Sequence, residues 1–98
     1  MDAEPLLNER HVLEAQTFVE IVVWRLPRPL RGSMHRFKYR LALVSNGVCV
    51  LRYDNEDGKG DHRHFGGKEG AYAFTTPEKL LADFQHDVSR WNHENRNS

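Results

Sequence analysis

The stretch from residue 54 to residue 64 concentrates side chains that can move protons or bind anions. Its chemically active members are Asp54, Asn55, Glu56, Asp57, Lys59, Asp61, His62, Arg63 and His64. Two imidazoles can divide the roles of proton donor and proton acceptor near neutral pH. An extended backbone would place His62 and His64 on one side and Arg63 on the other. This composition favours metal-independent acid–base chemistry on a phosphodiester.

That hypothesis gives a role to each kind of side chain. His62 and His64 would act as acid and base, and Lys59 or Arg63 would stabilise the negative charge that develops around phosphorus. The candidate catalytic residues are therefore His62, His64, Lys59, Asp61, Asp54 and Arg63. Chemistry of this kind needs no cofactor and no metal ion.

Three other interpretations of the same stretch remain open. A divalent metal ion could be held by His62, His64 and a nearby aspartate, although their spacing matches no standard metal motif. The amides and the lysine of Gly58-Lys59-Gly60 could instead cradle an anion. The stretch could also be a solvated turn in which Asp and Asn side chains cap their own backbone.

Charge is distributed unevenly along the chain, although 14 Lys and Arg residues balance 14 Asp and Glu residues. Residues 1–20 carry five acids and one base, residues 21–53 carry seven bases and no acid, and residues 54–98 carry nine acids and six bases. The zero total excludes a histone-like polybasic protein and an acidic disordered tail. The acid-free middle third is typical of a surface that binds RNA phosphates or an acidic protein.

The candidate binding residues lie in or beside that middle third. They are Arg36, Lys38, Arg40, Arg52, Tyr53 and Asn55. The acid-rich run that follows Arg52 could screen these bases until a partner displaces it. Solubility and edge protection would also account for a basic sheet face.

Length and composition limit the architecture. The 98 residues suffice for a single domain, and we expect residues 1–9 and 94–98 to be disordered. Cys49 is the only cysteine, which excludes an internal disulfide and fits a reducing, cytoplasmic setting. Apolar runs such as residues 21–24 are far shorter than a membrane span of about 20 residues. The acidic N-terminus lacks the layout of a signal peptide.

Strand signals fill the first half of the chain. Residues 17–26 are rich in β-branched and aromatic side chains, and a weaker strand signal precedes them at residues 10–14. Residues 35–44 alternate between apolar and mostly basic side chains. That alternation predicts an antiparallel strand with one buried face.

The second half begins with a hairpin and ends with a helix. The dipeptide Asn46-Gly47 followed by residues 48–53 predicts a β-hairpin with the preceding strand. The glycine-rich residues 54–70 predict a long loop, with at most a short extended piece at residues 62–65. Residues 71–75 predict another short strand.

The register of the hairpin decides which face each side chain takes. A three-residue loop, Ser45-Asn46-Gly47 with a glycine bulge, gathers the apolar side chains on one face. That face would hold Phe37, Tyr39, Leu41, Leu43, Cys49, Leu51 and Tyr53. The thiol of Cys49 would then be buried, and Arg40 would stand directly opposite Arg52 on the other face.

A helix start is visible at Thr76-Pro77-Glu78, with threonine at the N-cap and proline at the first helical position. We expect the helix to run to about His93. Its apolar positions recur at helical spacing: Leu80, Leu81, Phe84, Val88 and Trp91. The sequence thus predicts an α+β fold, an antiparallel sheet of four or five strands with one C-terminal helix packed on its apolar face.

Four segments of the chain share a pattern with a known family. They are His35-x-Phe-Lys-Tyr-Arg-Leu, Arg52-Tyr-Asp-Asn-Glu, Gly58-Lys-Gly-Asp-His-Arg-His and residues 81–84. Together they resemble the TumE family of small bacterial and archaeal toxin–antitoxin proteins. The resemblance extends from about residue 18 to residue 91 and is most specific at residues 53–64. It carries no catalytic residue over to this chain.

Membership of that family would imply the toxin half of a type II toxin–antitoxin pair, neutralised by a cognate antitoxin protein. Together with the paired histidines, it favours a cytoplasmic toxin that acts on RNA as a small endoribonuclease. The alternative is a non-enzymatic module that engages an acidic partner protein through the basic face. The sequence predicts no membrane association and leaves the oligomeric state open, a homodimer included.

Overall fold

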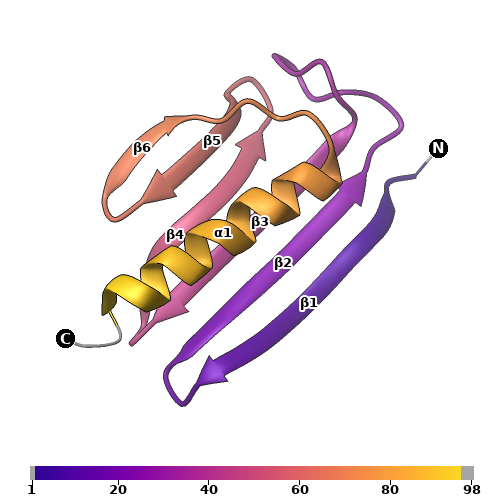
Figure 1. The fold of residues 1–98 in the computed structure, drawn as a ribbon. Helices are drawn as coiled ribbons and strands as arrows, with labels where there is room; N and C mark the ends of the chain where they lie inside the picture. The colour runs from indigo at the N-terminus through magenta and orange to yellow at the C-terminus, as the bar shows by residue number, and fades with distance from the viewer. Residues whose placement is uncertain (1, 96–98) are drawn as a thin grey trace.

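Consecutive strands of the chain pair with one another across a single antiparallel sheet, in the order β1-β2-β3-β4-β5-β6 (Figure 1). The computed structural model describes residues 2–95. The elements are β1 (Glu4–Glu14), β2 (Thr17–Arg25), β3 (Phe37–Ser45), β4 (Val48–Glu56), β5 (Gly60–Phe65), β6 (Lys68–Ala71) and α1 (Pro77–Asn95). The predicted α+β class with one C-terminal helix is confirmed, but the sheet has six strands rather than four or five.

Helix α1 lies across one face of the sheet and packs on β3 and β4 (Figure 1). Its predicted start is confirmed, because the backbone N–H of Lys79 donates to the hydroxyl of Thr76 at 3.1 Å. The helix extends to Asn95, two residues beyond the expected end. Leu80 and Phe84 are its buried apolar side chains, together with the carboxylate of Asp87.

The core lies between α1 and the middle strands. It contains Val19, Val23, Tyr39, Leu41, Leu43, Leu51, Tyr53, Leu80 and Phe84. The alternation at residues 35–44 therefore predicted the buried face of β3 correctly. Burial of each large apolar side chain stabilises the fold by about 1.5–3 kcal/mol.

The hairpin between β3 and β4 differs from the predicted one. Asn46 and Gly47 both have positive φ, 51° and 78°, and form a two-residue turn of type I′ in which Ser45 pairs with Val48. The extra residue lies in the strand instead, where the register shifts between Leu43 and Val44. Beyond the bulge, the side chains of Leu51 and Tyr53 lie on the core face of the sheet.

The two-residue turn and the bulge together correct the sequence prediction at two positions. Cys49 pairs with Val44 and is exposed, so its thiol is not part of the core. Arg40 pairs with Asp54 and Arg52 pairs with Ala42, so the two arginines do not face each other. Both differences arise because the extra residue lies in β4 and the turn has only two residues.

The predicted loop over residues 54–70 is in fact strand for most of its length. Strand β4 continues to Glu56, and β5 and β6 follow as an antiparallel hairpin. Glycines at positive φ, including Gly58, Gly66 and Gly67, make the intervening turns, which is why the stretch is glycine-rich. Of residues 71–75, which predicted a strand, only Ala71 lies in one.

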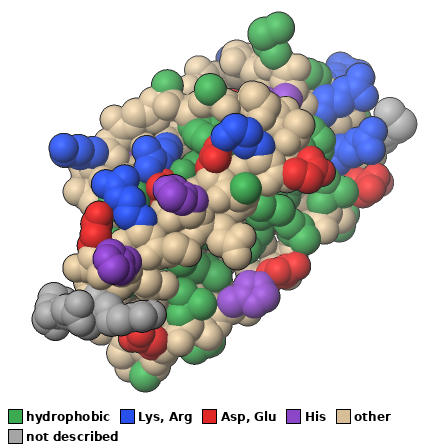
Figure 2. All heavy atoms as spheres, in the orientation of Figure 1, with side chains coloured by type: hydrophobic (Ala, Val, Ile, Leu, Met, Phe, Trp, Pro, Cys, Tyr) green, Lys and Arg blue, Asp and Glu red, His purple; other side chains and the backbone are tan. Residues whose placement is uncertain are grey.

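The N-terminal residues 4–9 also depart from expectation, since they form the first half of β1 rather than a disordered lead-in. Asn95 ends α1, and residues 96–98 of the expected disordered tail lie outside the described residues. Helix α1 packs on β3 and β4 (Figure 1), and an apolar groove of about 500 Å³ lies between it and the first two strands (Figure 2). Within residues 2–95, no helix is long and apolar enough to span a bilayer.

Candidate active site

Strand β5 directs the side chains of the chemically active stretch to two different faces of the sheet. Residues alternate along a strand, so His62 and His64 point to the face that α1 leaves open, and Arg63 points toward the helix. The contacts of Arg63 agree, because its guanidinium group binds Asp87 of α1 at 2.6 Å. The expectation that both imidazoles share one side is therefore confirmed.

A hollow of about 360 Å³ lies around the two histidines on the open face. Its lining residues are Arg52, Asp54, Glu56, Lys59, His62, His64 and Glu69. Strand pairing explains the grouping, since Arg52 and Glu69 flank His64 on the two neighbouring strands and Asp54 flanks His62. The turn between β4 and β5 adds Lys59.

Glu69 connects the two imidazoles. Its Oε1 atom lies 3.5 Å from Nδ1 of His62 and 3.5 Å from Nε2 of His64. The two ring nitrogens are thus separated by no more than twice that distance. Side chains of both histidines are about 30% exposed, at 30% and 27%, so the rings are held in place and still accessible to a ligand.

The hydrogen bonds around the rings distinguish their proton roles. Nε2 of His64 lies 3.0 Å from Nη2 of Arg52, and because a guanidinium group only donates, this nitrogen presents a lone pair. Nε2 of His62 lies 2.7 Å from the carbonyl oxygen of Lys59, so this nitrogen carries a proton. These two contacts assign Nε2 of His64 as an acceptor and Nε2 of His62 as a donor.

Two cationic side chains stand beside the imidazoles. Arg52 contacts His64 and also lies 3.2 Å from the carboxylate of Asp54. Lys59 lies 3.4 Å from Glu56, at the rim of the hollow, and its side chain is 71% exposed. An anion that enters the hollow would meet both, and there Arg offers paired donors and Lys a point charge.

Asp61 and Arg63, two of the six candidate catalytic residues, lie outside the hollow. Oδ2 of Asp61 accepts hydrogen bonds from the hydroxyl of Tyr39 at 2.5 Å and from Nε2 of His35 at 2.9 Å. Burial and this hydrogen bond raise the pKa of Tyr39. Odd positions of β5 face the helix side, so both residues belong to structural networks there rather than to the histidine pair.

Tyr53 and Asn55, expected among the binding residues, are buried. The Tyr53 hydroxyl donates to Asp87 at 2.5 Å, and burial together with this bond raises the pKa of Tyr53. The Asn55 side chain, 1% exposed, accepts from the backbone N–H of Tyr39 and donates to the carbonyl of Phe37. Tyr53 ties β4 to α1, Asn55 ties β4 to β3, and both side chains are closed to a ligand.

The basic face is partly neutralised by carboxylates from the flanking strands. Strand pairing puts Lys38, Arg40 and Arg52 on the open face, and Arg36 precedes the first residue of β3. Arg40 lies opposite Asp54 and 3.7 Å from a carboxylate oxygen of Glu20. The screening of these bases by the acid-rich run is therefore made by paired strands, with no separate loop folding over them.

The proposed anion cradle at Gly58-Lys59-Gly60 is not formed. The amide of Gly58 donates to the carbonyl of Arg31 at 2.8 Å, and the amide of Lys59 donates to that of Glu56 at 3.1 Å. These two N–H groups are therefore used within the protein. Across residues 2–95, no group of three or more His, Cys, Asp or Glu side chains is arranged to hold a metal ion.

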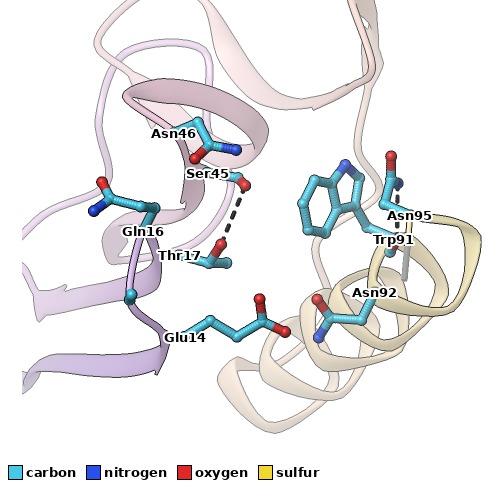
Figure 3. Close-up of a pocket in the computed structure, with 9 residues that line it drawn as sticks. Glu14, Gln16, Thr17, Ser45, Asn46, Trp91, Asn92 and Asn95 are labelled. Carbon is cyan, nitrogen blue, oxygen red and sulfur yellow. Dashed lines mark hydrogen bonds between the residues drawn. The ribbon is translucent and has the colours of Figure 1, made fainter. Parts of the chain in front are cut away.

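A separate hollow of about 410 Å³ lies at the other end of the molecule, between the β1–β2 turn and the end of α1 (Figure 3). Amide and hydroxyl side chains dominate it, with a hydrogen bond of 3.1 Å between Thr17 and Ser45. Glu14 is the one titratable side chain among its lining residues. This hollow therefore lacks the acid–base pair that the histidine hollow has.

Two residues that shape these sites were missed in the sequence. Glu69 follows the Gly66-Gly67 turn, and reading that turn as a hairpin would have set it beside His64. Asp87 lies seven residues after Leu80, within the apolar stripe of α1, and a carboxylate in that position signals a buried partner.

Comparison with known proteins identifies the family. A family model described as Toxin TumE matches residues 2–92. No curated protein and no solved structure gives a significant match. The match covers nearly the whole chain and includes every residue of the histidine hollow. The chain belongs to the TumE toxin family.

Proposed function

We propose that this protein is the toxin of a type II toxin–antitoxin pair and cleaves RNA in the cytoplasm without a metal ion. The observation that carries the proposal is the pair of imidazoles in one hollow, with Glu69, Arg52 and Lys59 beside them. A proton acceptor, a proton donor and cations are the groups that transfer of a phosphodiester to a neighbouring hydroxyl requires.

The reaction follows from the hydrogen bonds of the two rings. His64 removes the proton of a ribose 2′-hydroxyl, and the 2′-oxygen forms a bond to phosphorus. The bond from phosphorus to the 5′-oxygen breaks as His62 donates its proton to that oxygen. The products are a 2′,3′-cyclic phosphate and a 5′-hydroxyl, with no water consumed. Arg52 and Lys59 stabilise the negative oxygens of the pentacovalent state.

Replacement of either histidine tests the proposal. We expect His62→Ala and His64→Ala each to lower the rate of RNA cleavage by about 100-fold or more, and to relieve growth arrest when the toxin is expressed. His86→Ala, which changes an exposed histidine on α1, is the matched control and should behave like the parent. A double histidine variant as toxic and as active as the parent would refute the proposal.

A substrate with an activated leaving group separates the two roles. A uridine 3′-phosphate ester of 4-nitrophenol releases a phenolate that needs no proton, so His62→Ala should cleave it nearly as fast as the parent. His64→Ala should remain slow, because the attacking hydroxyl still needs a base. Loss of both activities to the same degree would contradict the assignment, and loss of parent activity in a chelator would contradict metal independence.

The alternative, a non-enzymatic module for an acidic partner, receives less support from the charges. Ion pairs of Arg40 with Glu20 and of Arg52 with Asp54 reduce the positive potential of the open face. The antitoxin partner itself is part of the proposal. Co-expression with the product of the neighbouring reading frame should restore growth, and failure to do so would count against the toxin–antitoxin pairing.

A further inference from the structure

Another hollow, of about 310 Å³ and here called the second hollow, lies on the helix side of β5 and β6. Its lining residues are Arg63, Phe65, Lys68, Glu69, Gly70, Ala71 and Arg90. Three of these are cations and one is aromatic. Figure 2 shows a group of Lys and Arg side chains on this face, over the region of β5, β6 and the C-terminal half of α1.

Two guanidinium groups of this hollow lie close to the Phe65 ring. The guanidinium carbon of Arg90 lies 4.8 Å from the centre of the Phe65 ring, and that of Arg63 lies 5.6 Å from it. Arg63 is held by Asp87 and Arg90 by Glu94, at 2.6 Å and 3.1 Å. Nucleic-acid bases stack on aromatic rings and on guanidinium planes held in this way.

The second hollow adjoins the histidine hollow across the edge of the sheet. Glu69 lines both of them, and along β5 the residues of the two hollows alternate. Strand β6 has only four residues, all exposed, and forms the edge of the sheet beyond β5. A single strand of nucleic acid that crosses the exposed strand β6 would reach both hollows.

We propose that this hollow is a subsite for a nucleotide of single-stranded RNA next to the one whose phosphate is cleaved. The base stacks against Arg90 and Phe65, and Lys68 binds a phosphate where the strand crosses β6. The inference rests on the proposed ribonuclease function, and it adds that the substrate is single-stranded and reaches past the scissile phosphate.

Binding of RNA tests the subsite directly. The probe is a fluorescently labelled single-stranded octaribonucleotide, and its Kd for the His64→Ala protein is measured by anisotropy. We expect Lys68→Ala and Arg90→Ala each to raise Kd about tenfold. Lys68→Ala should also lower the slope of log Kd against log salt by about 0.7, the loss of one phosphate contact. Arg28→Ala, an exposed base that lines neither hollow, is the control.

Arg90→Lys distinguishes stacking from charge alone. Lysine keeps the positive charge but lacks the guanidinium plane, so this variant should bind nearly as weakly as Arg90→Ala. Full affinity in Arg90→Lys would overturn the stacking role. Both Lys68 and Arg90 are exposed, and unchanged circular dichroism should show that their variants fold.

Cleavage kinetics separate failure of the subsite from failure of the function. With the octanucleotide, Lys68→Ala should raise KM about tenfold and change kcat less than about twofold, because a distant contact binds ground state and transition state alike. With the uridine 3′-phosphate ester of 4-nitrophenol, which has no neighbouring nucleotide and cannot reach the subsite, the variant should match the parent. If the parent cleaves and binds RNA but the variants are indistinguishable from it, the subsite is refuted and the proposed function stands. If the parent neither binds nor cleaves RNA, the proposed function itself fails.

Discussion

A single buried carboxylate, Asp87, joins the helix to two strands. Its side chain is 5% exposed, and its Oδ2 atom accepts from the Tyr53 hydroxyl at 2.5 Å and from Nε of Arg63 at 2.7 Å. A second guanidinium nitrogen of Arg63 lies 2.6 Å away. Partial burial lowers the pKa of Arg63, but the hydrogen bond to Asp87 raises it, with a net rise. The charge of Asp87 is therefore matched where it is buried.

Removal of this carboxylate should be one of the costliest single changes on the helix. Asp87→Ala leaves the Arg63 charge and the Tyr53 hydroxyl without their partner. Because the Arg63 side chain is 37% exposed and partly screened by water, we expect the free energy of unfolding to fall by about 2–3 kcal/mol. Tyr53→Phe removes one neutral donor and should cost about 1–2 kcal/mol. Urea denaturation followed by circular dichroism measures both. Ser89→Ala on the exposed side of α1 is the control, and a loss of similar size there would contradict the specific role of Asp87.

At the scale of the element, the hairpin between β3 and β4 shows how far local pattern reaches. Alternation assigned Tyr39, Leu41 and Leu43 to the core because a period of two is a local property. The position of the bulge depends on the fit of β4 to its neighbours and to α1, which no short window of sequence contains. The error at Cys49 follows from that difference.

The same limit applies to the candidate site. That His62 and His64 share a face could be predicted, because it needs only an extended backbone. That Arg63 meets Asp87, or that Glu69 meets both histidines, depends on pairing between segments that are separate in the sequence. The glycine content of residues 54–70 predicts one long loop, but these glycines form tight turns between strands.

The turn of this hairpin gives a test at the same scale. Gly47 has a φ of 78°, and an added Cβ would meet no atom within 4 Å, so the cost of Gly47→Ala is one of backbone conformation alone. We expect a loss of about 1 kcal/mol in the free energy of unfolding. Gly70→Ala is the matched control, because this glycine also has open space around it but no positive φ. Equal effects of the two substitutions on the urea midpoint would contradict the type I′ turn.

At the scale of the whole molecule, the sheet mixes charges that the sequence keeps apart. Strand β3 comes from the acid-free third, and its Arg40 lies between Glu20 of β2 and Asp54 of β4. In the loops, Nε of Arg31 binds the carboxylate of Asp57 at 2.8 Å. The hydrogen bond from the Arg31 backbone N–H lowers the pKa of Asp57 most, and the bond from its side chain lowers it further. Among residues 2–95, bases of the acid-free third are thus paired with carboxylates of neighbouring strands and loops, which reduces the positive charge of the open face.

Carboxylates in such pairs make the stability of the fold depend on pH. Lys79 and the Tyr72 hydroxyl bind Asp83, at 2.8 Å and 2.6 Å, and tie the segment after β6 to α1. Two hydrogen bonds lower the pKa of Asp83 below its ordinary value of 3.8, and the bond from Lys79 has a larger effect than the bond from Tyr72. Because the folded-state pKa is the lower one, the stabilisation is complete above 3.8 and is lost as the pH falls through the folded-state value.

Asp83→Asn should therefore destabilise the protein in a pH-dependent way. At neutral pH we expect the free energy of unfolding to fall by about 0.5–1 kcal/mol, a value reduced by the partial exposure of the carboxylate. The gap between parent and variant should narrow as the pH falls below 3.8, since the parent loses the same charge by protonation. Urea denaturation over a series of pH values measures the gap, with Glu94→Gln on the exposed end of α1 as the control. A gap that stayed constant or widened in acid would show that Asp83 stabilises the molecule by something other than its charge.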